Sequence, residues 1–486
     1  FCVKADFAES SGTHNTGMAK VINSLLIEMG LTTPPQKTNK EVRTTVDGYP
    51  IAIFHRETAS DTLEFVGKYN FNNDKSTAET FGFSDGDESW EFSNNTSDRC
   101  LFKSADFSGT DWTNDFESRY PDDDAINAEY EAGTRKPEKL MAVTSWVVST
   151  KDNLDKFKNE VRNHFNLDNL IAYYLITELF GMVDQRAKNM FLTYFHEEGK
   201  WIFIFYDNDT CFGLNNEGLI AFGYNIEYHD KIGTLNVWNG ESSVLWNNLE
   251  KCFPSEIEAM YKDIRTRGLL SYDLIMSVLN GEQSDKWCEA IYNADGRFKY
   301  IDPLIEEGNG SYLYAAQGSR IENRKWWTYN RFLYIDSKYT AGSFLSDFAT
   351  LRLYTPREWT GVSPSANMTI IPYADQYTRV KYGSYMVGQR TYKDVPVLIE
   401  APDIVFNDTE TIIYGASRVK SLGDMSGLYA GTIDVSKASR LSELLIGSGV
   451  SGYQNTNLTV LSIGTNNMLR KLDIRNCPNL RQAVDI

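Results

Sequence analysis

Hydrophobic residues recur at helical spacing in two long segments of the chain. Between Thr13 and Met29 the apolar positions lie three and four residues apart, with Thr13 as the expected N-cap and Gly30 as the expected C-cap. The same periodicity returns from Lys156 to Phe180, and that run ends at Gly181. The pattern predicts two helices that pack on a hydrophobic core.

Short apolar runs with strand character flank these helices. Met190–Phe195 and Trp201–Tyr206 are rich in aromatic residues, and the polar stretch His196–Lys200 separates them, which is typical of a β-hairpin. Further strands are expected next to Lys4 and between Val46 and Glu57. Residues from about 84 to 137 are acidic and poor in aliphatic side chains, so we expect a solvated insertion there.

The next part of the chain returns to helical spacing. Val244–Met276 is predicted to be helical, with core positions Leu245, Trp246, Leu249, Ile257 and Tyr261. Tyr312–Tyr339 is dense in arginine and aromatic residues and predicts a heavily packed helix. In an acidic chain we interpret its arginines as internal ion-pair partners or a contact surface; they are Arg320, Arg324 and Arg331.

The pattern changes again after residue 345. Residues 346–420 contain short apolar runs separated by proline and glycine, which predicts a small β domain with Pro396 on an edge strand. Residues 421–486 contain a repeat: Leu458-x-x-Leu461-x-Ile463 is followed by Leu469-x-x-Leu472-x-Ile474, and a weaker copy starts at Leu441. The copies resemble leucine-rich repeats, but their spacing of 11 residues is shorter than a full repeat of about 20–29 residues.

Charge and composition exclude several classes of protein. The 486 residues carry a formal net charge of −18, which argues against a broad surface for nucleic acid or anionic membranes. We find no apolar run near the roughly 20 residues of a membrane span, and no signal peptide. The six cysteines form no CxxC pair, so we expect buried free thiols and a reducing origin. Because the chain begins at Phe1 and ends at Ile486 inside a repeat, we expect a piece of a longer product.

The candidate chemistry lies between residues 184 and 209. Asp184 and Asn189 follow the apolar helix, while Asp207 and Asp209 follow the second strand of the hairpin. Carboxylate and amide oxygens held on hydrophobic elements are the ligands of magnesium–phosphate sites. The alternative is structural, since aspartates at strand ends also cap turns.

Taken in order, these features resemble the CotH family of kinase-like proteins. The matching residues are the strand with Lys4, the helix after it, the segment Gly48-Tyr49 to Glu57, Asp184-x4-Asn189, and Asp207-x-Asp209-x-x-Phe212-Gly213. The resemblance covers roughly residues 1–340 and is thin between 84 and 140.

The resemblance implies an atypical protein-kinase fold and transfer of phosphate from ATP in active members. It implies Asp184 as the catalytic base, Asn189 and Asp207 as magnesium ligands with Asp209 as helper, and Lys4 as a phosphate contact. Glu28 could face Lys4, as the helix glutamate does in kinases, and the alternative that we favour is a surface charge.

Two features depart from the family pattern. The family's glycine-rich turn should precede Lys4, and the segment before Asp184 is Gly-Met-Val, without a basic residue beside the aspartate. We therefore expect either a missing upstream part or a degenerate nucleotide site.

Three functions remain open, and we favour the first over catalysis. The first is a catalytically degenerate virion protein of the phage tail or baseplate type, because the stretches GKYNFNNDK and NRFLYIDSKY resemble that group. Its partners would be other copies or virion proteins, and its location the virion. The second is an active Mg²⁺/ATP-dependent kinase, with a cytoplasmic location as the alternative, whose repeats bind its substrate. The third, a carbohydrate-binding or adhesive protein, is not selected by any residue.

The sequence predicts an α+β chain in four parts. These are a kinase-like N-lobe (1–145), a helical C-lobe with the Asp184 site (146–345), a small β domain (346–420) and an incomplete leucine-rich segment (421–486).

Overall fold

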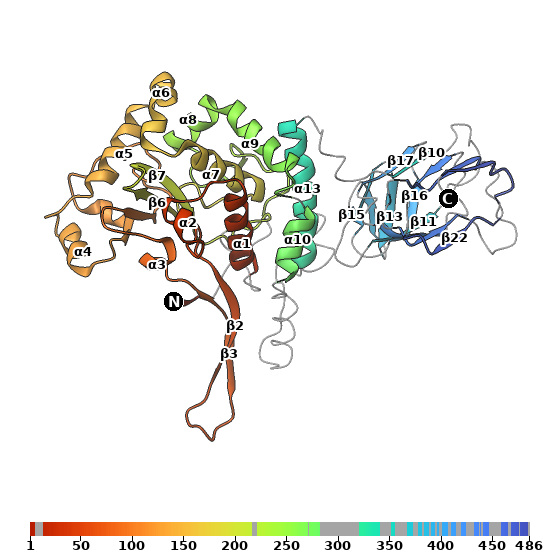
Figure 1. The fold of residues 1–486 in the computed structure, drawn as a ribbon, viewed down its shortest axis with the longest axis horizontal. Helices are drawn as coiled ribbons and strands as arrows, with labels where there is room; N and C mark the ends of the chain where they lie inside the picture. The colour runs from red at the N-terminus through yellow and green to blue at the C-terminus, as the bar shows by residue number, and fades with distance from the viewer. Residues whose placement is uncertain are drawn as a thin grey trace. The chain divides into compact units, whose positions relative to one another are not determined.

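The computed structural model describes most of the N-terminal two-thirds of the chain and the strands of the remainder. The described residues are 1–4, 13–215, 221–270, 272–281, 320–340, 351–354, 367–372, 378–381, 383–387, 390–393, 396–397, 401–406, 410–414, 419–423 and most of 432–484. They form two compact units, Phe1–Ile335 and Asp336–Ile486 (Figure 1). Cys288 and the start of the arginine-rich segment, 312–319, lie outside the described residues.

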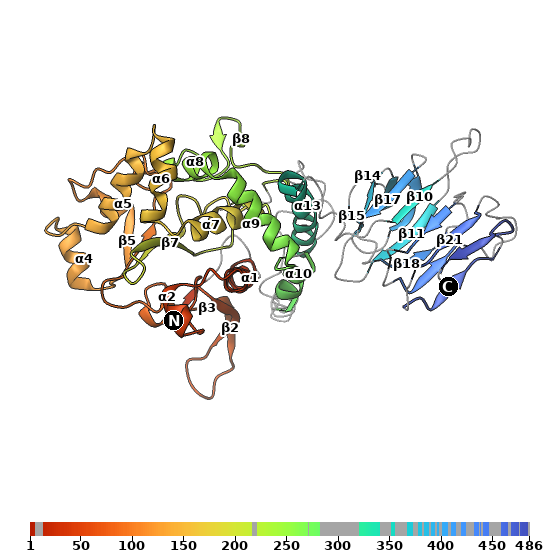
Figure 2. The same ribbon diagram turned by 45° about the horizontal axis from the view of Figure 1, so that its top comes forward.

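A small antiparallel sheet begins the first unit. Its strands are β1 (Cys2–Lys4), β2 (Gly48–His55) and β3 (Glu64–Asn72), in the order β1-β3-β2. Lys4 lies opposite Asn70, and Cys2 lies opposite Asn72, so these four side chains share one face. The β2–β3 hairpin extends away from the helices of the unit (Figures 1 and 2).

The first predicted helix is confirmed. Helix α1 spans Thr13–Glu28, and Gly30 adopts a left-handed φ of 76° just after its end. The buried face is made by Met18, Val21, Ile22, Leu25 and Leu26, all at most 4% exposed. A short helix follows, α2 (Pro34–Thr38), whose N-cap Thr33 and Gln36 bond reciprocally.

The second sheet corrects the expected solvated insertion. Its order is β5-β4-β6-β7, with β4 (Glu88–Phe92), β5 (Phe116–Tyr120), β6 (Met190–Phe195) and β7 (Lys200–Phe205). Two of these four strands come from the acidic stretch 84–137, which also contains η1 (Asp111–Asn114) and α4 (Asp124–Glu131). Aromatic side chains replace the missing aliphatic ones in its core: Trp90, Phe92, Phe107, Trp112, Phe116 and Tyr130 are buried. The segment α3 (Ala78–Phe81) precedes β4.

Helix α7 (Leu167–Phe180) lies at the centre of the helical part. Every residue in it except Asp168 is buried, and it packs against β7 and α9 (Pro254–Thr266). The other described helices of this part are α5 (Glu138–Ser149), α6 (Leu154–His164), α8 (Val244–Cys252), α10 (Tyr272–Gly281) and α13 (Arg320–Thr340), and a small hairpin is formed by β8 (Lys231–Ile232) and β9 (Leu235–Asn236).

The predicted helical core after residue 244 is also confirmed, although the helix is divided. The break between α8 and α9 falls at Phe253, directly before Pro254. All five predicted core residues are at most 3% exposed. In α13, Arg331 is buried and donates to the carbonyl oxygens of Glu178, Tyr224 and Ile226. This arginine is internal, with backbone carbonyls among its partners, and its predicted role as an ion-pair partner stays a prediction.

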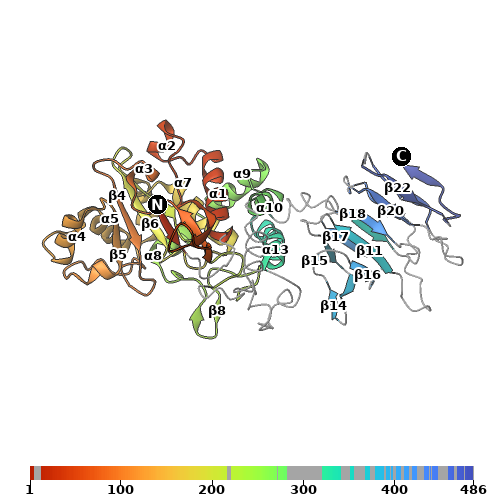
Figure 3. The ribbon, with the colours of Figure 1, turned by 90° about the horizontal axis from the view of Figure 1, so that it is seen from below.

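The second unit contains two seven-stranded sheets. One has the order β15-β12-β17-β10-β19-β21-β23, and the other β14-β13-β16-β11-β18-β20-β22 (Figure 3). The antiparallel strands are β10 (Leu351–Tyr354), β11 (Asn367–Pro372), β12 (Thr378–Lys381), β13 (Gly383–Val387), β14 (Arg390–Lys393), β15 (Pro396–Val397), β16 (Ala401–Phe406) and β17 (Glu410–Tyr414). The proline-containing β15 lies at the edge of its sheet, as predicted.

The last six strands alternate between the two sheets. They are β18 (Val419–Gly423), β19 (Thr432–Asp434), β20 (Glu443–Leu445), β21 (Val460–Ser462), β22 (Lys471–Asp473) and β23 (Gln482–Val484). Within each sheet they pair in parallel, so Leu444 lies beside Leu472 and Ile433 beside Leu461. The 11-residue copies at 461 and 472 therefore occupy opposite sheets, and a full turn needs two of them.

These pairings join two parts that the sequence analysis separated. β10 pairs with β19, and β11 pairs with β18, so the segments 346–420 and 421–486 belong to one compact unit. The repeat positions still form its interior: Leu441, Leu444, Ile446, Leu458, Leu461 and Ile463 are buried. Ile474 is 37% exposed because β22 is the end strand of its sheet.

Two further expectations concern the cysteines and membranes. Cys100, Cys211 and Cys252 are buried thiols, whereas Cys2 is exposed. In the described part of the chain, no helix has the length and apolar character needed to span a bilayer.

Candidate functional site

The β6–β7 hairpin brings Asn189 and Asp207 to the same end of the sheet. Met190, the first residue of β6, lies directly opposite Phe205, the last residue of β7. Asn189 therefore lies one residue before Met190, and Asp207 lies two residues after Phe205, so both extend past the same end of the hairpin. Both adopt a left-handed backbone, with φ of 53° and 55°, which is uncommon for residues other than glycine and is concentrated at functional sites.

Asp184 lies in the loop between α7 and β6. Helix α7 ends because Gly181 takes a left-handed φ of 59°, and its N–H bonds back to the helix. The carboxylate of Asp184 is 2% exposed and accepts a hydrogen bond from the Asn189 side-chain amide at 2.8 Å. The side-chain amide of Asn239 donates to the other carboxylate oxygen. The two amides fix the direction of a buried carboxylate.

Gln185 connects the Asp184 loop to the Asp207 segment. Its side-chain amide donates to the backbone carbonyl of Asp207 at 2.5 Å, and its carbonyl oxygen accepts from Thr210 Oγ1 at 3.3 Å. Its own backbone carbonyl accepts from Tyr173 OH of α7 at 2.7 Å. The two acidic segments are thus held together by a buried glutamine.

Arg186 anchors the same loop in an aromatic cage. Its guanidinium carbon lies 3.9 Å from the Tyr174 ring centroid, 4.3 Å from that of Tyr228 and 4.8 Å from that of Trp238. It also donates to Thr177 Oγ1 and to the Tyr174 carbonyl. The aromatic faces compensate part of the cost of burying this cation.

Lys4 forms an ion pair with Asp207. The two side chains are 29% and 18% exposed, so the pair is partly shielded from solvent. Burial lowers the pKa of Lys4, but the negative charges of Asp207 and Asp209 and the hydrogen bond to Asp207 raise it above its ordinary value. Lys4 is therefore a fixed cation next to Asp207.

Helix α1 contributes its first turn to this site. Asn15 donates to the Asp207 carboxylate at 3.2 Å and accepts from the backbone N–H of Asn208 at 3.2 Å. His14 contacts the backbone carbonyl of Asp209 at 3.4 Å, and Asp209 itself is 8% exposed. The structure therefore brings Asp209 near the other predicted residues.

The structure does not bring Glu28 to Lys4, which corrects the expected pairing. Asn15, at the first turn of α1, reaches Asp207, whereas Glu28 is the last residue of the helix and is exposed. Glu28 lies 13 positions after Asn15, which is about 20 Å along the helix axis. Lys4 pairs with Asp207 instead.

The donor set fits a magnesium ion bound together with phosphate. The described residues contain no group of three or more His, Cys, Asp or Glu side chains that could hold a metal alone. Magnesium is commonly bound by one or two carboxylates and completed by substrate phosphates and water. The Asp207 carboxylate and the Asn189 amide, at adjacent strand ends, provide that kind of incomplete oxygen set.

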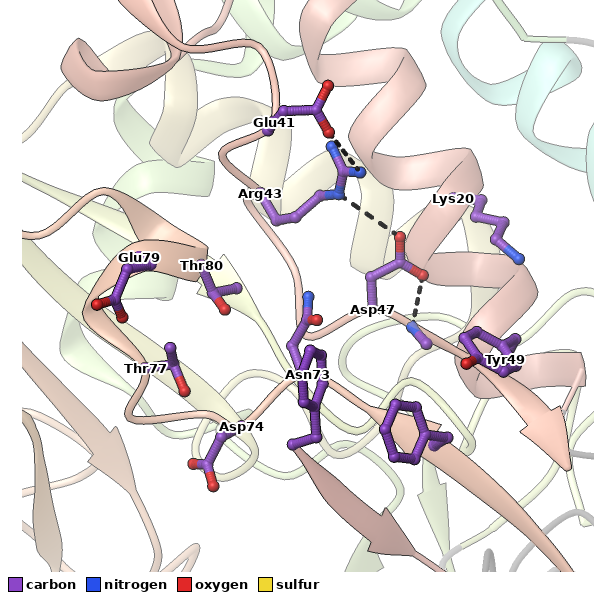
Figure 4. A pocket seen from close by; sticks show the side chains of 13 residues that line it. Lys20, Glu41, Arg43, Asp47, Tyr49, Asn73, Asp74, Thr77, Glu79 and Thr80 are labelled. Carbon is purple, nitrogen blue, oxygen red and sulfur yellow. Dashed lines mark hydrogen bonds and ion pairs between the residues drawn. The ribbon is translucent and has the colours of Figure 1, made fainter.

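A separate pocket of about 640 Å³ opens beside the N-terminal sheet. Figure 4 shows Lys20, Glu41, Arg43, Asp47 and other polar side chains around it, with Arg43 paired to both carboxylates. Lys4, Asp184, Asn189 and Asp207 are not among the described residues that line it. This pocket is therefore distinct from the acidic site.

Sequence reasoning did not identify Asn15, Gln185 and Asn239. Gln185 lies beside Asp184 but has no motif of its own. The only signal for Asn239 was the dipeptide Asn239-Gly240, which marks a turn.

Comparison with known protein families gives a match to the central part of the chain. Residues 73–271 match the family model described as CotH kinase protein. A comparison with curated proteins found no match. The matched segment includes Asp184, Asn189, Asp207 and Asp209, whereas Lys4 and Glu28 precede it. A CotH kinase protein domain is therefore present over residues 73–271 of this chain.

Proposed function

We propose that the first unit is a bilobal, kinase-like core that binds Mg²⁺ and ATP and transfers a phosphoryl group to a hydroxyl of a partner protein. The observation that carries the proposal is the convergence of Asp184, Asn189 and Asp207 at one end of the β6–β7 hairpin, with Lys4 paired to Asp207. These are the groups that phosphoryl transfer needs: a base, metal ligands and a phosphate-binding cation.

Each residue has a defined part in this reaction. Asp184 orients the acceptor hydroxyl and takes its proton while the hydroxyl oxygen bonds to the terminal phosphorus of ATP and the bond to ADP breaks. Asn189 and Asp207 would hold magnesium, which neutralises phosphate charge when bound, with Asp209 next to them. Lys4 would contact phosphate oxygens. The amides of Asn189 and Asn239 keep the Asp184 carboxylate in one orientation.

The test measures ATP binding and turnover with the full chain. ATP and Mg²⁺ together should raise the free energy of unfolding by about 3–4 kcal/mol at ligand concentrations roughly 100 to 1,000 times the dissociation constant. Asp207→Asn should remove the Mg²⁺-dependent part of this shift. Asp184→Asn should lower turnover by at least about 100-fold, with binding retained.

Asp61→Asn is the matched control, because Asp61 is an exposed aspartate that accepts a hydrogen bond from the Thr58 backbone at 2.8 Å in the hairpin tip. It should leave binding and turnover unchanged. Absence of both a thermal shift and turnover in the wild-type chain would end the proposal of an active kinase.

A second candidate is a structural role in a virion, as in a phage tail or baseplate, with a catalytically degenerate core. It is favoured by the projecting β2–β3 hairpin, on which Tyr49, Phe54 and Leu63 are 54%, 49% and 55% exposed. Exposed apolar side chains are typical of protein contact surfaces where they gather into one contiguous patch. Self-assembly of the full chain without ATP turnover, seen by light scattering and a nucleotide assay, is the result that this role predicts.

A further inference from the structure

Two lysines approach the ring of Tyr206, the residue directly before Asp207. The ammonium nitrogen of Lys4 lies 5.5 Å from the ring centroid, and that of Lys75 lies 4.9 Å from it. Tyr206 itself stacks on Phe191 of β6 at 5.2 Å, so the ring is fixed in position. Lys75 comes from the connection between β3 and α3, far from Lys4 in sequence. The fold thus places a second cation beside the proposed metal ligand.

The backbone around Lys75 is held by the turn in which it lies. Asn73 donates its backbone N–H to the Asp47 carbonyl at 2.9 Å, and Ser76 donates its own to Asp74 Oδ1 at 3.0 Å. The Lys75 ammonium is therefore presented from an ordered segment on one side of the ring.

The charge of Lys75 is only partly neutralised. Its partner is Glu91 of β4, with the nitrogen 2.8 Å from Oε2, and the same oxygen accepts from Arg119 Nε at 2.6 Å. One carboxylate thus faces two cations. The Glu91 side chain is 7% exposed and the Lys75 side chain is 30% exposed, so the lysine is the member of the pair that reaches solvent.

A polyphosphate at this site needs such a cation. Asp184, Asp207 and Asp209 would repel phosphate oxygens, and the positive charge of Lys4 is already matched by Asp207. An ammonium group has three N–H donors, and Glu91 and the Tyr206 ring do not use all of them. Lys75 can therefore donate to an anion while it remains paired with Glu91.

We propose that Lys75 is a second phosphate-contacting residue of the nucleotide site, and that a nucleoside polyphosphate binds next to Tyr206 within reach of both lysines. This inference rests on the proposed function, because it assigns a residue to the same nucleotide site. It goes beyond that proposal by naming a positively charged side chain that the family-like motif does not include.

The chain contains a closely matched control. Lys139 of α5 pairs with Glu88 of the same strand β4 at 2.9 Å and lies 5.1 Å from the ring centroid of Tyr194. Lys139 thus repeats the carboxylate and ring contacts of Lys75 with a different carboxylate and ring. Tyr194 is near the far end of β6, away from Asn189 and Asp207. Substitution of Lys139 should therefore lower the stability of the fold about as much as substitution of Lys75 does, and it should leave nucleotide affinity unchanged.

The experiment titrates ATP and adenosine, with Mg²⁺ present, into the full-length wild type, Lys75→Met, Lys75→Arg and Lys139→Met. Methionine keeps the unbranched stem over the ring and removes only the charge, and Glu91 remains paired with Arg119. Lys75→Met should weaken ATP binding by at least about tenfold, since a hydrogen bond to a charged group is lost. Lys75→Arg should retain most of the affinity, and Lys139→Met should bind like the wild type.

Adenosine separates contact with phosphate from damage to the pocket. Its affinity should be the same in wild type and Lys75→Met, and added salt should weaken ATP binding less in the variant than in the wild type. Equal ATP affinity in wild type and Lys75→Met, or an equal loss for adenosine, overturns the assignment of Lys75 and leaves the proposed function in place. A wild-type chain that binds no ATP overturns both.

Discussion

The side-chain amide of Asn239 donates a hydrogen bond to the carboxylate of Asp184, although 55 positions separate the two residues in the chain. Asn239 also donates its backbone N–H to the Val183 carbonyl at 2.8 Å, so the contact fixes the loop and the side chain together. The segment before α8 is therefore part of the candidate site.

Substitution of Asn239 should lower turnover, although Asn239 lies far from Asp184 in the sequence. Asn239→Ala leaves one oxygen of a buried carboxylate without this donor, which costs about 1–3 kcal/mol in unfolding free energy. Turnover should fall with little change in ATP affinity, measured by a coupled nucleotide assay and chemical denaturation. Asn236→Ala is the control, because Asn236 makes an exposed bond of 2.8 Å to Glu241 in the same segment. Equal turnover in both variants would contradict a positioning role.

Gly240 should not accept a side chain. A Cβ at this position would lie 2.4 Å from the Arg186 carbonyl oxygen, and its φ is +91°. A strained left-handed residue alone costs about 1 kcal/mol of unfolding free energy. Gly240→Ala should cost more than this, because the clash with the Arg186 carbonyl adds to the strain. Gly233→Ala isolates that strain, because Gly233 has φ +63° and open space around its Cβ. The prediction fails if urea denaturation gives the two variants the same stability.

Arg186 should not be replaceable by lysine. Arg186→Lys loses the planar contacts with Tyr174, Tyr228 and Trp238 and the donors to Thr177 and the Tyr174 carbonyl. We expect a loss of about 2–4 kcal/mol in unfolding free energy. The exposed Arg162, 5.4 Å from the Phe253 ring centroid, provides the control substitution Arg162→Lys, which should change stability little. Similar melting temperatures for both variants would contradict the cage interpretation.

His164 should make the fold less stable in mild acid. Burial, including stacking on Trp146 at 4.1 Å, lowers the pKa of His164 below its ordinary value of 6.5, with Lys156 adding to the shift and Glu160 opposing it. Between the two pKa values the unfolded chain binds more protons than the folded chain. Stability contributed by His164 is therefore present above pH 6.5 and is lost as the pH falls toward the folded-state pKa.

The test compares thermal unfolding of His164→Gln and wild type from pH 8 to pH 5. The variant should lose less stability than the wild type across that range. His55→Gln is the control at an exposed histidine. Parallel pH profiles for wild type and His164→Gln would rule out this contribution.

The local parts of the fold and of the site were predictable, because they depend on contiguous residues. Helix, loop and hairpin from 169 to 207 follow from hydrophobic periodicity, and the hairpin register then brings Asn189 and Asp207 together. Asn15 and Asn239 were not predictable, since polar residues in a first turn or a loop give no periodic signal.

Two errors have a common physical origin. The stretch 84–137 was expected to be solvated because aliphatic residues are rare in it, yet Trp90 and Trp112 bury large rings and supply the core instead. Glu28 was placed near Lys4 by analogy, whereas the length of α1 carries it to the opposite end. Composition and the order of motifs do not show which residues lie close together in the fold.

The alternation of β18–β23 between two sheets has a consequence for how the C-terminal unit can change in length. Insertion of one 11-residue copy before β21 would move every later strand to the other sheet. Leu472 would then lie beside residues that are now neighbours of Leu461. Insertion of two copies restores the parity of the strands. The unit can therefore grow or shrink only in pairs of copies.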